Sequence, residues 1–366
     1  MKRKFLMMAC AALVIGITSC SKDDPTPDPI PQTTVGAYVL NGGKFGSNNS
    51  SLTYFNPATK EATYNVFSTK NGKKLGDSGQ DMAIYGSKMY INVYNSGVIF
   101  VTDKQAKIIK EIQIKEYKAP RSVIAYNGKI YVTYYEGALA QIDTTTFEVK
   151  TVKVGANPEA LKAANGKIYV ANSGGMNTPL GNTVSVVDPI AFKVLKDIKV
   201  ADNPTMLQAD SQGDIYVISM GNYYDVPPTF QRIDAKTDVV SAMEVSIVNA
   251  EGKKVILPVP SYMAMGANDK LYIVSGENDA TWLLQGKIYT LNAATEKVEG
   301  ELIQDGTVVK NMYYLSADKV SGNIYAGSSD YKTNGDMYVF SPDGKLIQKF
   351  DTGGINPIGV YFLTNK

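Results

Sequence analysis

Residues 165–177 read NGKIYVANSGGMN, and the first six of these letters also occur at residues 127–132, where TYYEGA follows them. Asn-Gly tolerates the positive φ angles of a two-residue hairpin turn, and the apolar run after it has the composition of a short strand. A strand that repeats while the following residues diverge indicates a scaffold with variable loops. The stretch therefore predicts a repetitive β protein whose function lies in its loops.

The same apolar run occurs seven times, and each copy contains a tyrosine: Tyr38, Tyr90, Tyr131, Tyr169, Tyr216, Tyr272 and Tyr325. The spacing stays near the roughly 40 to 50 residues of a propeller blade. Residues 157–200 contain one complete unit, with an inner strand NPEALKAA followed by KIYVAN, TVSVVD and VLKDIKV. Four strands in each of seven units, with no helical period, predict an all-β, seven-bladed β-propeller.

The two ends of the repeat region support a closed ring. Residues 36–68 supply only three strands, whereas INPIGVYFL at 355–363 matches the inner strand of the other units. We expect this C-terminal strand to join the N-terminal blade, which would remove the exposed sheet edge. Two packed β-domains, the alternative, would leave the last strand without a partner. The predicted propeller covers residues 36–366.

The first twenty residues, MKRKFLMMACAALVIGITSC, have a basic start and an apolar run too short to span a bilayer, as in a secretory signal. Residues 17–20 resemble the bacterial lipobox, which predicts a signal peptide over 1–19 and lipidation of Cys20; an ordinary signal peptide is the alternative. The other cysteine, Cys10, lies in the segment to be removed. Residues 20–35 are acidic and proline-rich, which favours an extended tether.

Residues 21–24, SKDD, resemble the acidic signal that sends Bacteroidota lipoproteins to the outer face of the outer membrane. A solvated spacer explains these charges equally well. With the first interpretation, the expected location is the outer membrane, with a lipid anchor and the propeller facing outward.

The sequence lacks the residues that several kinds of chemistry require. The 37 Lys and Arg residues nearly balance 35 Asp and Glu, so no basic surface for nucleic acid is expected. The sequence contains no histidine, which excludes a Ser-His pair and His-ligated zinc. We expect no enzyme, cofactor or metal site. Loop carboxylates could still cleave glycans if two of them faced each other: Glu136, Asp225, Glu277, Asp279 and Asp330.

The connections between second and third strands are long and different in every unit, whereas the hairpin turns are short and uniform. Such a distribution indicates that one face of the disc is a binding surface. Aromatic and amide side chains recur in these loops, which suits a large, mostly neutral ligand. The predicted ligand-binding residues are Phe45, Asn92, Tyr94, Arg121, Tyr134, Tyr135, Asn172, Met176, Asn222, Tyr223, Tyr224, Asp279, Trp282, Asp330 and Tyr331.

The connections from one unit to the next add residues to the same mouth: Gln80, Arg121, Asn157, Asn203, Tyr262 and Asn311. Asparagine is also an ordinary turn residue, so about half of the named asparagines are expected to be turn formers only.

The IYVAN-type strand and the NP-led inner strand resemble the YVTN class of propellers, which includes the YncE-like proteins. Together with the lipobox and the tether, they resemble the cobalamin-binding surface lipoproteins of Bacteroidota, the BtuG family. This resemblance implies capture of cobalamin or a related corrinoid as a bound ligand and its delivery to a TonB-dependent transporter barrel (BtuB-like). A glycan-binding or glycan-cleaving propeller and a protein-interaction scaffold are the alternatives.

Overall fold

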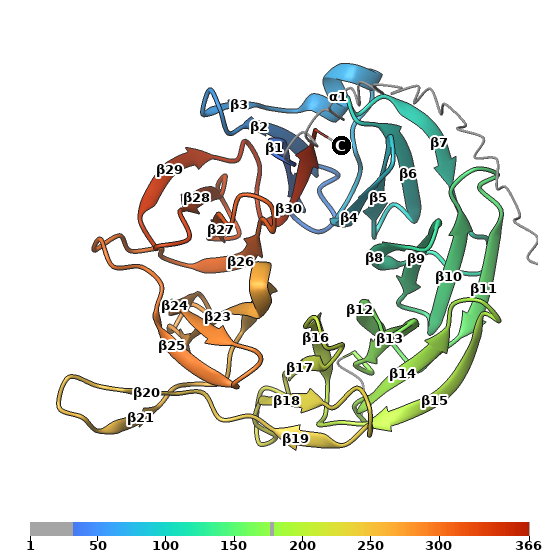
Figure 1. Ribbon diagram of the computed structural model, residues 1–366. Helices are drawn as coiled ribbons and strands as arrows, with labels where there is room; N and C mark the ends of the chain where they lie inside the picture. Colours follow the sequence, from blue (N-terminus) through green and yellow to red (C-terminus); the bar gives the residue numbers. More distant parts are fainter. Residues whose placement is uncertain (1–31, 176–178, 366) are drawn as a thin grey trace, which may run out of the picture. The chain divides into compact units, whose positions relative to one another are not determined.

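The computed structural model describes residues 32–175 and 179–365, and one compact unit begins at Thr33. Seven four-stranded antiparallel sheets surround a central axis in this unit, as the blades of a propeller do (Figure 1). The predicted seven-bladed fold is therefore confirmed. The predicted signal peptide, Cys20 and nearly all of the tether lie outside the described residues.

The first four blades follow the same order from the axis outward. Their strands are β30 (Pro357–Thr364), β1 (Thr34–Asn41), β2 (Ser51–Asn56) and β3 (Glu61–Thr63) in blade 1; β4 (Gly79–Tyr85), β5 (Lys88–Val93), β6 (Val98–Asp103) and β7 (Ile108–Ile112) in blade 2; β8 (Pro120–Tyr126), β9 (Lys129–Tyr134), β10 (Ala138–Asp143) and β11 (Val149–Lys153) in blade 3; and β12 (Pro158–Ala164), β13 (Lys167–Asn172), β14 (Thr183–Asp188) and β15 (Lys193–Lys199) in blade 4.

The remaining blades repeat this order. Their strands are β16 (Pro204–Ala209), β17 (Ile215–Ser219), β18 (Thr229–Ile233) and β19 (Val240–Ala242) in blade 5; β22 (Tyr262–Met265), β23 (Lys270–Asn278), β24 (Leu284–Asn292) and β25 (Lys297–Glu301) in blade 6; and β26 (Met312–Ala317), β27 (Ile324–Ser328), β28 (Asp336–Phe340) and β29 (Leu346–Asp351) in blade 7.

Strand β30 closes the ring. It pairs antiparallel with β1, with Tyr361 opposite Tyr38, and it supplies the inner strand that blade 1 would otherwise lack. The C-terminal strand therefore joins the N-terminal blade, as the sequence predicts.

The hydrophobic core lies between the blades. Each of seven apolar clusters combines residues of two neighbouring blades. All seven repeated tyrosines are buried, and none is more than 4% exposed. The repeated residues therefore build the scaffold.

The hairpin turns adopt the expected backbone. Asn127 and Gly128 have φ angles of 46° and 77°, and Asn165 and Gly166 have 47° and 73°. Consecutive positive φ angles are what a two-residue type I′ turn requires. The repeated Asn-Gly pairs therefore connect first to second strands, as predicted.

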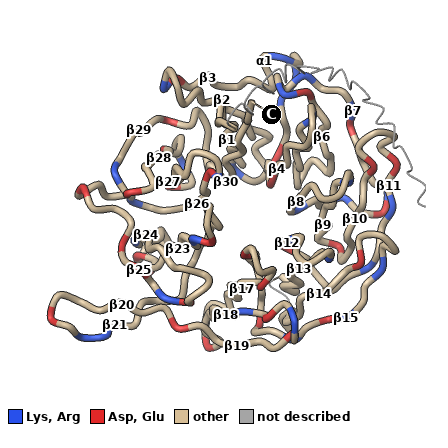
Figure 2. Tube along the Cα trace, viewed as in Figure 1, with Lys and Arg blue, Asp and Glu red and all other residues tan. Residues whose placement is uncertain are grey.

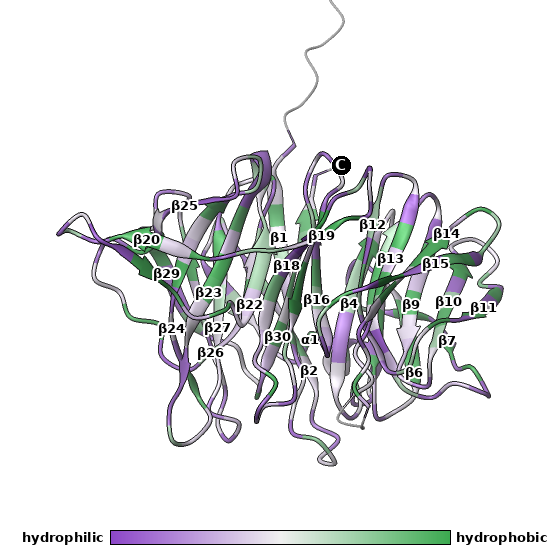
Figure 3. Ribbon diagram, turned by 90° about the horizontal axis from the view of Figure 1, so that it is seen from below, coloured by the Kyte–Doolittle hydropathy of each residue, from purple (hydrophilic) through white to green (hydrophobic). Residues whose placement is uncertain are grey.

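Successive strands of each blade run in opposite directions, so the connections between strands lie on two opposite faces of the disc. The loop face carries the connections from second to third strands and from one blade to the next, and the hairpin face carries the other connections. Figure 3 shows longer loops at the lower edge of the propeller and the C-terminal end at the upper edge.

Thr33 pairs with Asn365 through two hydrogen bonds, from the Thr33 amide to the Asn365 side chain (2.9 Å) and from the Asn365 amide to the Thr33 carbonyl (3.1 Å).

Three short elements lie outside the predicted repeat of four-stranded blades. Helix α1 (Val66–Asn71) precedes blade 2, the 3-10 turn η1 (Ala267–Asp269) lies between β22 and β23, and the hairpin of β20 (Ser246–Val248) and β21 (Lys254–Ile256) precedes blade 6. The Phe67 ring of α1 is buried and lies 4.9 Å from the Phe100 ring. A six-residue helix fixed by one aromatic anchor is too short to show a helical period. No helix within the described ranges has the length and apolar character to cross a bilayer.

Candidate ligand-binding site

A cavity of about 580 Å³ lies on the propeller axis. Its walls are side chains from the inner strands of all seven blades, β30, β4, β8, β12, β16, β22 and β26, together with Tyr223 from a loop of blade 5. The volume falls within the range of roughly 300 to 1,000 Å³ found for small-molecule pockets. We call this cavity the central channel.

The start of each inner strand determines which side chains line the channel. In blades 2, 3, 4, 5 and 7 the pairing register shifts immediately after the first strand residue. Such a β-bulge bends the strand and redirects a side chain. The residues that follow the first strand residue in these blades all line the channel: Gln80, Arg121, Glu159, Thr205 and Tyr313. With Tyr262 of blade 6, we call them the channel mouth.

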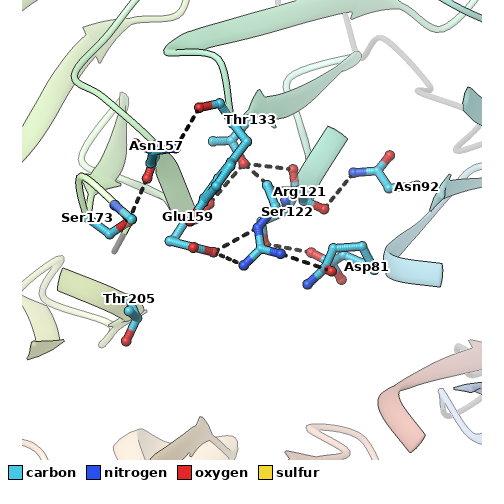
Figure 4. Close-up of polar contacts among 12 residues, drawn as sticks. Asp81, Asn92, Arg121, Ser122, Thr133, Asn157, Glu159, Ser173 and Thr205 are labelled. Carbon is cyan, nitrogen blue, oxygen red and sulfur yellow. Dashed lines mark hydrogen bonds and ion pairs between the residues drawn. The ribbon is translucent and has the colours of Figure 1, made fainter. Parts of the chain in front are cut away.

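Arg121 is the central residue of the blade 3 side of the mouth. Its Nε donates to a Glu159 carboxylate oxygen at 2.9 Å, its Nη2 pairs with the same oxygen, and its Nη1 donates to Gln80 at 3.1 Å (Figure 4). The guanidinium carbon lies 5.3 Å from the Tyr94 ring centre and 5.0 Å from the Tyr135 ring centre. These two aromatic contacts and the ion pair fix the guanidinium plane.

The opposite side of the mouth is phenolic. Tyr313 and Tyr331 pack edge to face with ring centres 5.3 Å apart. Burial raises the pKa of Tyr262, and the neighbouring phenols of Tyr313, Tyr331 and Tyr223 raise it further. Burial also raises the pKa of Tyr313 to about 12. The phenols are therefore neutral at physiological pH, where they can both donate and accept hydrogen bonds.

Glu159 is the buried carboxylate of the mouth. Burial raises its pKa, and the charge and hydrogen bonds of Arg121 act in the opposite direction. Its side chain is 15% exposed and that of Arg121 is 23% exposed. The ion pair keeps this carboxylate from being an unpaired buried charge.

The fifteen ligand-binding residues predicted from the sequence fall into groups. Arg121 and Tyr223 line the channel. Tyr94, Tyr135 and Tyr331 pack directly against mouth residues. Three loop aromatics are exposed to 69%, 91% and 68%: Phe45, Tyr224 and Trp282. Met176 lies outside the described residues.

Three of the predictions need correction because the side chains are buried. Asn92 is fully buried and donates to the Arg121 carbonyl at 2.9 Å. Asn172, which is 1% exposed, donates to Thr183 and Ser185 within its own sheet. Tyr134 is also 1% exposed and packs against Tyr117 at 5.9 Å between ring centres. These three residues support the site or the scaffold and do not face a ligand.

Three further predicted residues hold their own loops. The Asn222 side-chain oxygen accepts from three backbone amides, those of residues 224, 225 and 226. The Asp279 carboxylate accepts from Thr281 and Leu283, and Asp330 accepts from Lys332 and Thr333. These contacts are those of turn-forming Asx residues.

The asparagines that precede inner strands behave similarly. Asn157, Asn203 and Asn311 have φ angles of 47°, 62° and 53°, in the left-handed region that asparagine tolerates. The Asn157 and Asn203 side chains donate to loop carbonyls of Tyr135 and Gly221. They position the mouth without lining it.

Sequence reasoning missed Glu159, Thr205 and Tyr313 as members of the mouth. Each stands two residues after one of these left-handed asparagines, at one position of the repeat. That shared offset is a signal the sequence contains, but its meaning depends on the bulge, which cannot be read from the letters.

The distribution of charged side chains does not favour a metal site or a binding surface for a polyanion. Lys and Arg are interspersed with Asp and Glu around the ring (Figure 2). Within the described ranges, no group of three or more His, Cys, Asp or Glu side chains is placed to hold a metal ion. The mouth offers aromatic faces, phenols, the Gln80 amide and a stacked guanidinium that is paired with Glu159.

Residues 35–350 match the family described as a domain of unknown function, DUF5074. The chain belongs to the DUF5074 family. None of the curated proteins matches the sequence.

Solved structures share the fold. A hypothetical selenium-binding protein from Sulfolobus tokodaii superposes with a TM-score of 0.65 at 11% identity, covering 91% of this chain and 94% of that one. A 6-phosphogluconolactonase-like protein from Bacteroides fragilis gives 0.62 at 10% identity, with coverages of 90% and 98%. A quinonprotein alcohol dehydrogenase-like protein from Bacteroides thetaiotaomicron gives 0.62 at 16% identity, with coverages of 88% and 77%. At these identities the similarity establishes the propeller alone.

Proposed function

We propose that this DUF5074 protein captures cobalamin or a related corrinoid at the channel mouth, without turnover. The observation that carries the proposal is the set of neutral phenols on one side, and the stacked guanidinium on the other side, of a channel of about 580 Å³. A corrinoid is a flat macrocycle bordered by amide groups. Aromatic faces suit its flat surface, and phenols and Arg121 suit its amide oxygens.

The exposed loop aromatics extend this site beyond the channel. Tyr224 follows the channel-lining Tyr223, and Trp282 lies where β23 and β24 project as a long hairpin on the loop face. Large aromatic side chains supply contact area at little cost in side-chain entropy. A ligand larger than the channel can therefore rest on the mouth and be held from the side by these loops.

The proposal includes a lipid anchor on Cys20 and delivery to a TonB-dependent transporter in the outer membrane. The start of β1 lies on the hairpin face, opposite the channel mouth. The described chain thus enters the propeller on the face opposite the mouth, which supports access of a ligand and of a partner barrel to the mouth.

Calorimetric titration of the purified protein with cyanocobalamin tests the proposal. We expect submicromolar or tighter binding that changes little with salt, because most contacts are uncharged. Arg121→Met should weaken binding, because it removes the guanidinium that Tyr94 and Tyr135 hold in place. Arg232→Met is a matched control, because Arg232 forms its ion pairs with Asp214 and Glu296 away from the channel. Failure of the wild-type protein to bind any corrinoid would disprove the proposal.

A further inference from the structure

Lys162 is the fourth charged side chain that lines the central channel, after Asp81, Arg121 and Glu159. It belongs to β12 and stands three residues beyond Glu159. Three residues of strand span up to about 10 Å, so Lys162 lies well below the channel mouth. The arrangement places a cation inside the channel at a depth that a ligand resting on the mouth would reach only with a projecting group.

The other three charges of the channel are already engaged. Arg121 and Glu159 form the ion pair of the mouth. The Asp81 carboxylate accepts hydrogen bonds from the Ser122 hydroxyl (2.6 Å), the Tyr361 hydroxyl (2.7 Å) and the Val123 amide (2.8 Å). Of the four charged side chains that line the channel, two form an ion pair and a third, the Asp81 carboxylate, accepts hydrogen bonds from neutral donors.

Lys162 lacks a comparable partner among the described residues, with which it forms no hydrogen bond or ion pair. Burial lowers its pKa; the charge of Asp81 acts in the opposite direction, and the charge of Lys319 lowers the pKa further. The Lys162 side chain is only partly buried, and it lines the channel without a direct partner in the described part of the chain. An oxyanion beside this ammonium would supply the charge-assisted hydrogen bond that it lacks there.

We propose that Lys162 is an anion-recognition residue of the central channel, and that the ligand held at the mouth inserts a phosphate group toward it. This inference rests on the proposed corrinoid function and adds to it the part of the ligand that enters the channel. A compact ammonium with rotatable donors suits a single phosphate oxygen. Cobalamin carries one phosphodiester, in its nucleotide loop.

The test compares cobalamin with cobinamide, which lacks the nucleotide and its phosphate, by calorimetry. We expect the wild-type protein to prefer cobalamin by at least about tenfold, the worth of one charge-assisted hydrogen bond. Lys162→Met should abolish that preference, whereas Lys162→Arg should retain most of it. Lys199→Met is the matched control, because Lys199 is an exposed lysine on the outer strand of the same blade. It should behave as the wild type does.

Equal affinity of the wild-type protein for the two corrinoids would overturn the role of Lys162 and leave the corrinoid proposal standing. The same conclusion would follow if Lys162→Met lowered the melting temperature but left the preference unchanged, since Lys162 would then only balance the charge of Asp81. If neither corrinoid binds, the proposed function fails. The anion site is then judged by phosphorus NMR with inorganic phosphate, where saturable broadening that Lys162→Met removes supports it and absence of broadening overturns it.

Discussion

The hydroxyl groups of some of the repeated tyrosines connect neighbouring blades. Tyr38 of blade 1 donates to the Lys104 carbonyl of blade 2 at 2.7 Å, and Tyr216 of blade 5 donates to the Ala293 carbonyl of blade 6 at 3.1 Å. In both cases the acceptor lies in the turn between the third and fourth strands of the next blade. This contact gives a physical reason for tyrosine, where phenylalanine would fill the same space.

We expect Tyr216→Phe to lower the free energy of unfolding by about 1 kcal/mol, because it leaves a buried carbonyl without its donor. Equilibrium unfolding in urea measures this loss. Tyr90→Phe is the matched control, since the buried Tyr90 hydroxyl lacks a partner within the described residues. That substitution should be neutral or stabilising, and an equal loss in both variants would contradict the explanation.

Buried phenols also make the fold sensitive to alkali. Burial raises the pKa of Tyr38 and of Tyr90 to about 12, from an ordinary value of 10.0. A group whose pKa is raised on folding contributes stability that is complete below its unfolded pKa and is lost as the pH rises toward the folded one.

The contribution of these phenols to thermal stability should therefore be constant from neutral pH up to about pH 10 and be lost between pH 10 and 12. Melting curves across this range, combined with tyrosinate absorbance, provide the measurement. Ionisation of all tyrosines near pH 10 without loss of structure would show that these phenols are not buried as described.

At the scale of single elements, strands and hairpins could be predicted because their information is local. The Asn-Gly turns and the four strands of blade 4 lie where the sequence places them. The inner-strand bulges could not be predicted, since they depend on pairing with the neighbouring strand. Asn92 and Asn172 stand where a second strand meets a variable loop, which predicts a place at the mouth, but both side chains are buried in their sheets.

Helix α1 and the β20–β21 hairpin were missed for a different reason. Each is an insertion between blades, outside the repeat, and each is short. Phe67 stabilises α1 through packing against blade 2, and this tertiary contact is absent from any local pattern. The repeated part of the chain was thus predictable, and the insertions were not.

The β23–β24 hairpin brings Trp282 to the loop face, and the sequence contains no other tryptophan. We expect Trp282→Ala to weaken cobalamin binding by at least about tenfold, or ~1.4 kcal/mol, as for a central aromatic contact. Stability should change by less than about 0.5 kcal/mol, because the side chain is exposed.

Ile190→Ala is the matched control for this prediction. Ile190 is 92% exposed and lies in the turn between β14 and β15, on the hairpin face. The Ile190→Ala substitution should leave the affinity for cobalamin unchanged. Equal losses from both substitutions, measured by calorimetric titration, would argue against binding at the loop face.

At the scale of the whole molecule, stability depends on ring closure. Without β30, strand β1 would present an open edge, and buried residues such as Val360 and Leu363 would leave two of the apolar clusters. The net stability of a domain is only about 5 to 15 kcal/mol, less than the loss expected from a missing inner strand.

Deletion of residues 357–366 should therefore abolish cooperative unfolding and cause association through the open edge. Size-exclusion chromatography and thermal melting give the readout. Deletion of residues 365–366 alone, which retains β30, should yield a monomer that melts cooperatively. A truncated ring that melts as the intact one does would refute the importance of closure.

The pairing of β30 with β1 also bears on biosynthesis. Among the strands of the ring, the one that completes blade 1 is translated last, so an emerging polypeptide keeps the β1 edge unpaired until β30 has been synthesised. Chains that end before β30 would expose the unpaired backbone of β1 to association and to proteases, however well blades 2 to 7 had formed. The ring geometry thus makes protection of the β1 edge depend on the synthesis of β30.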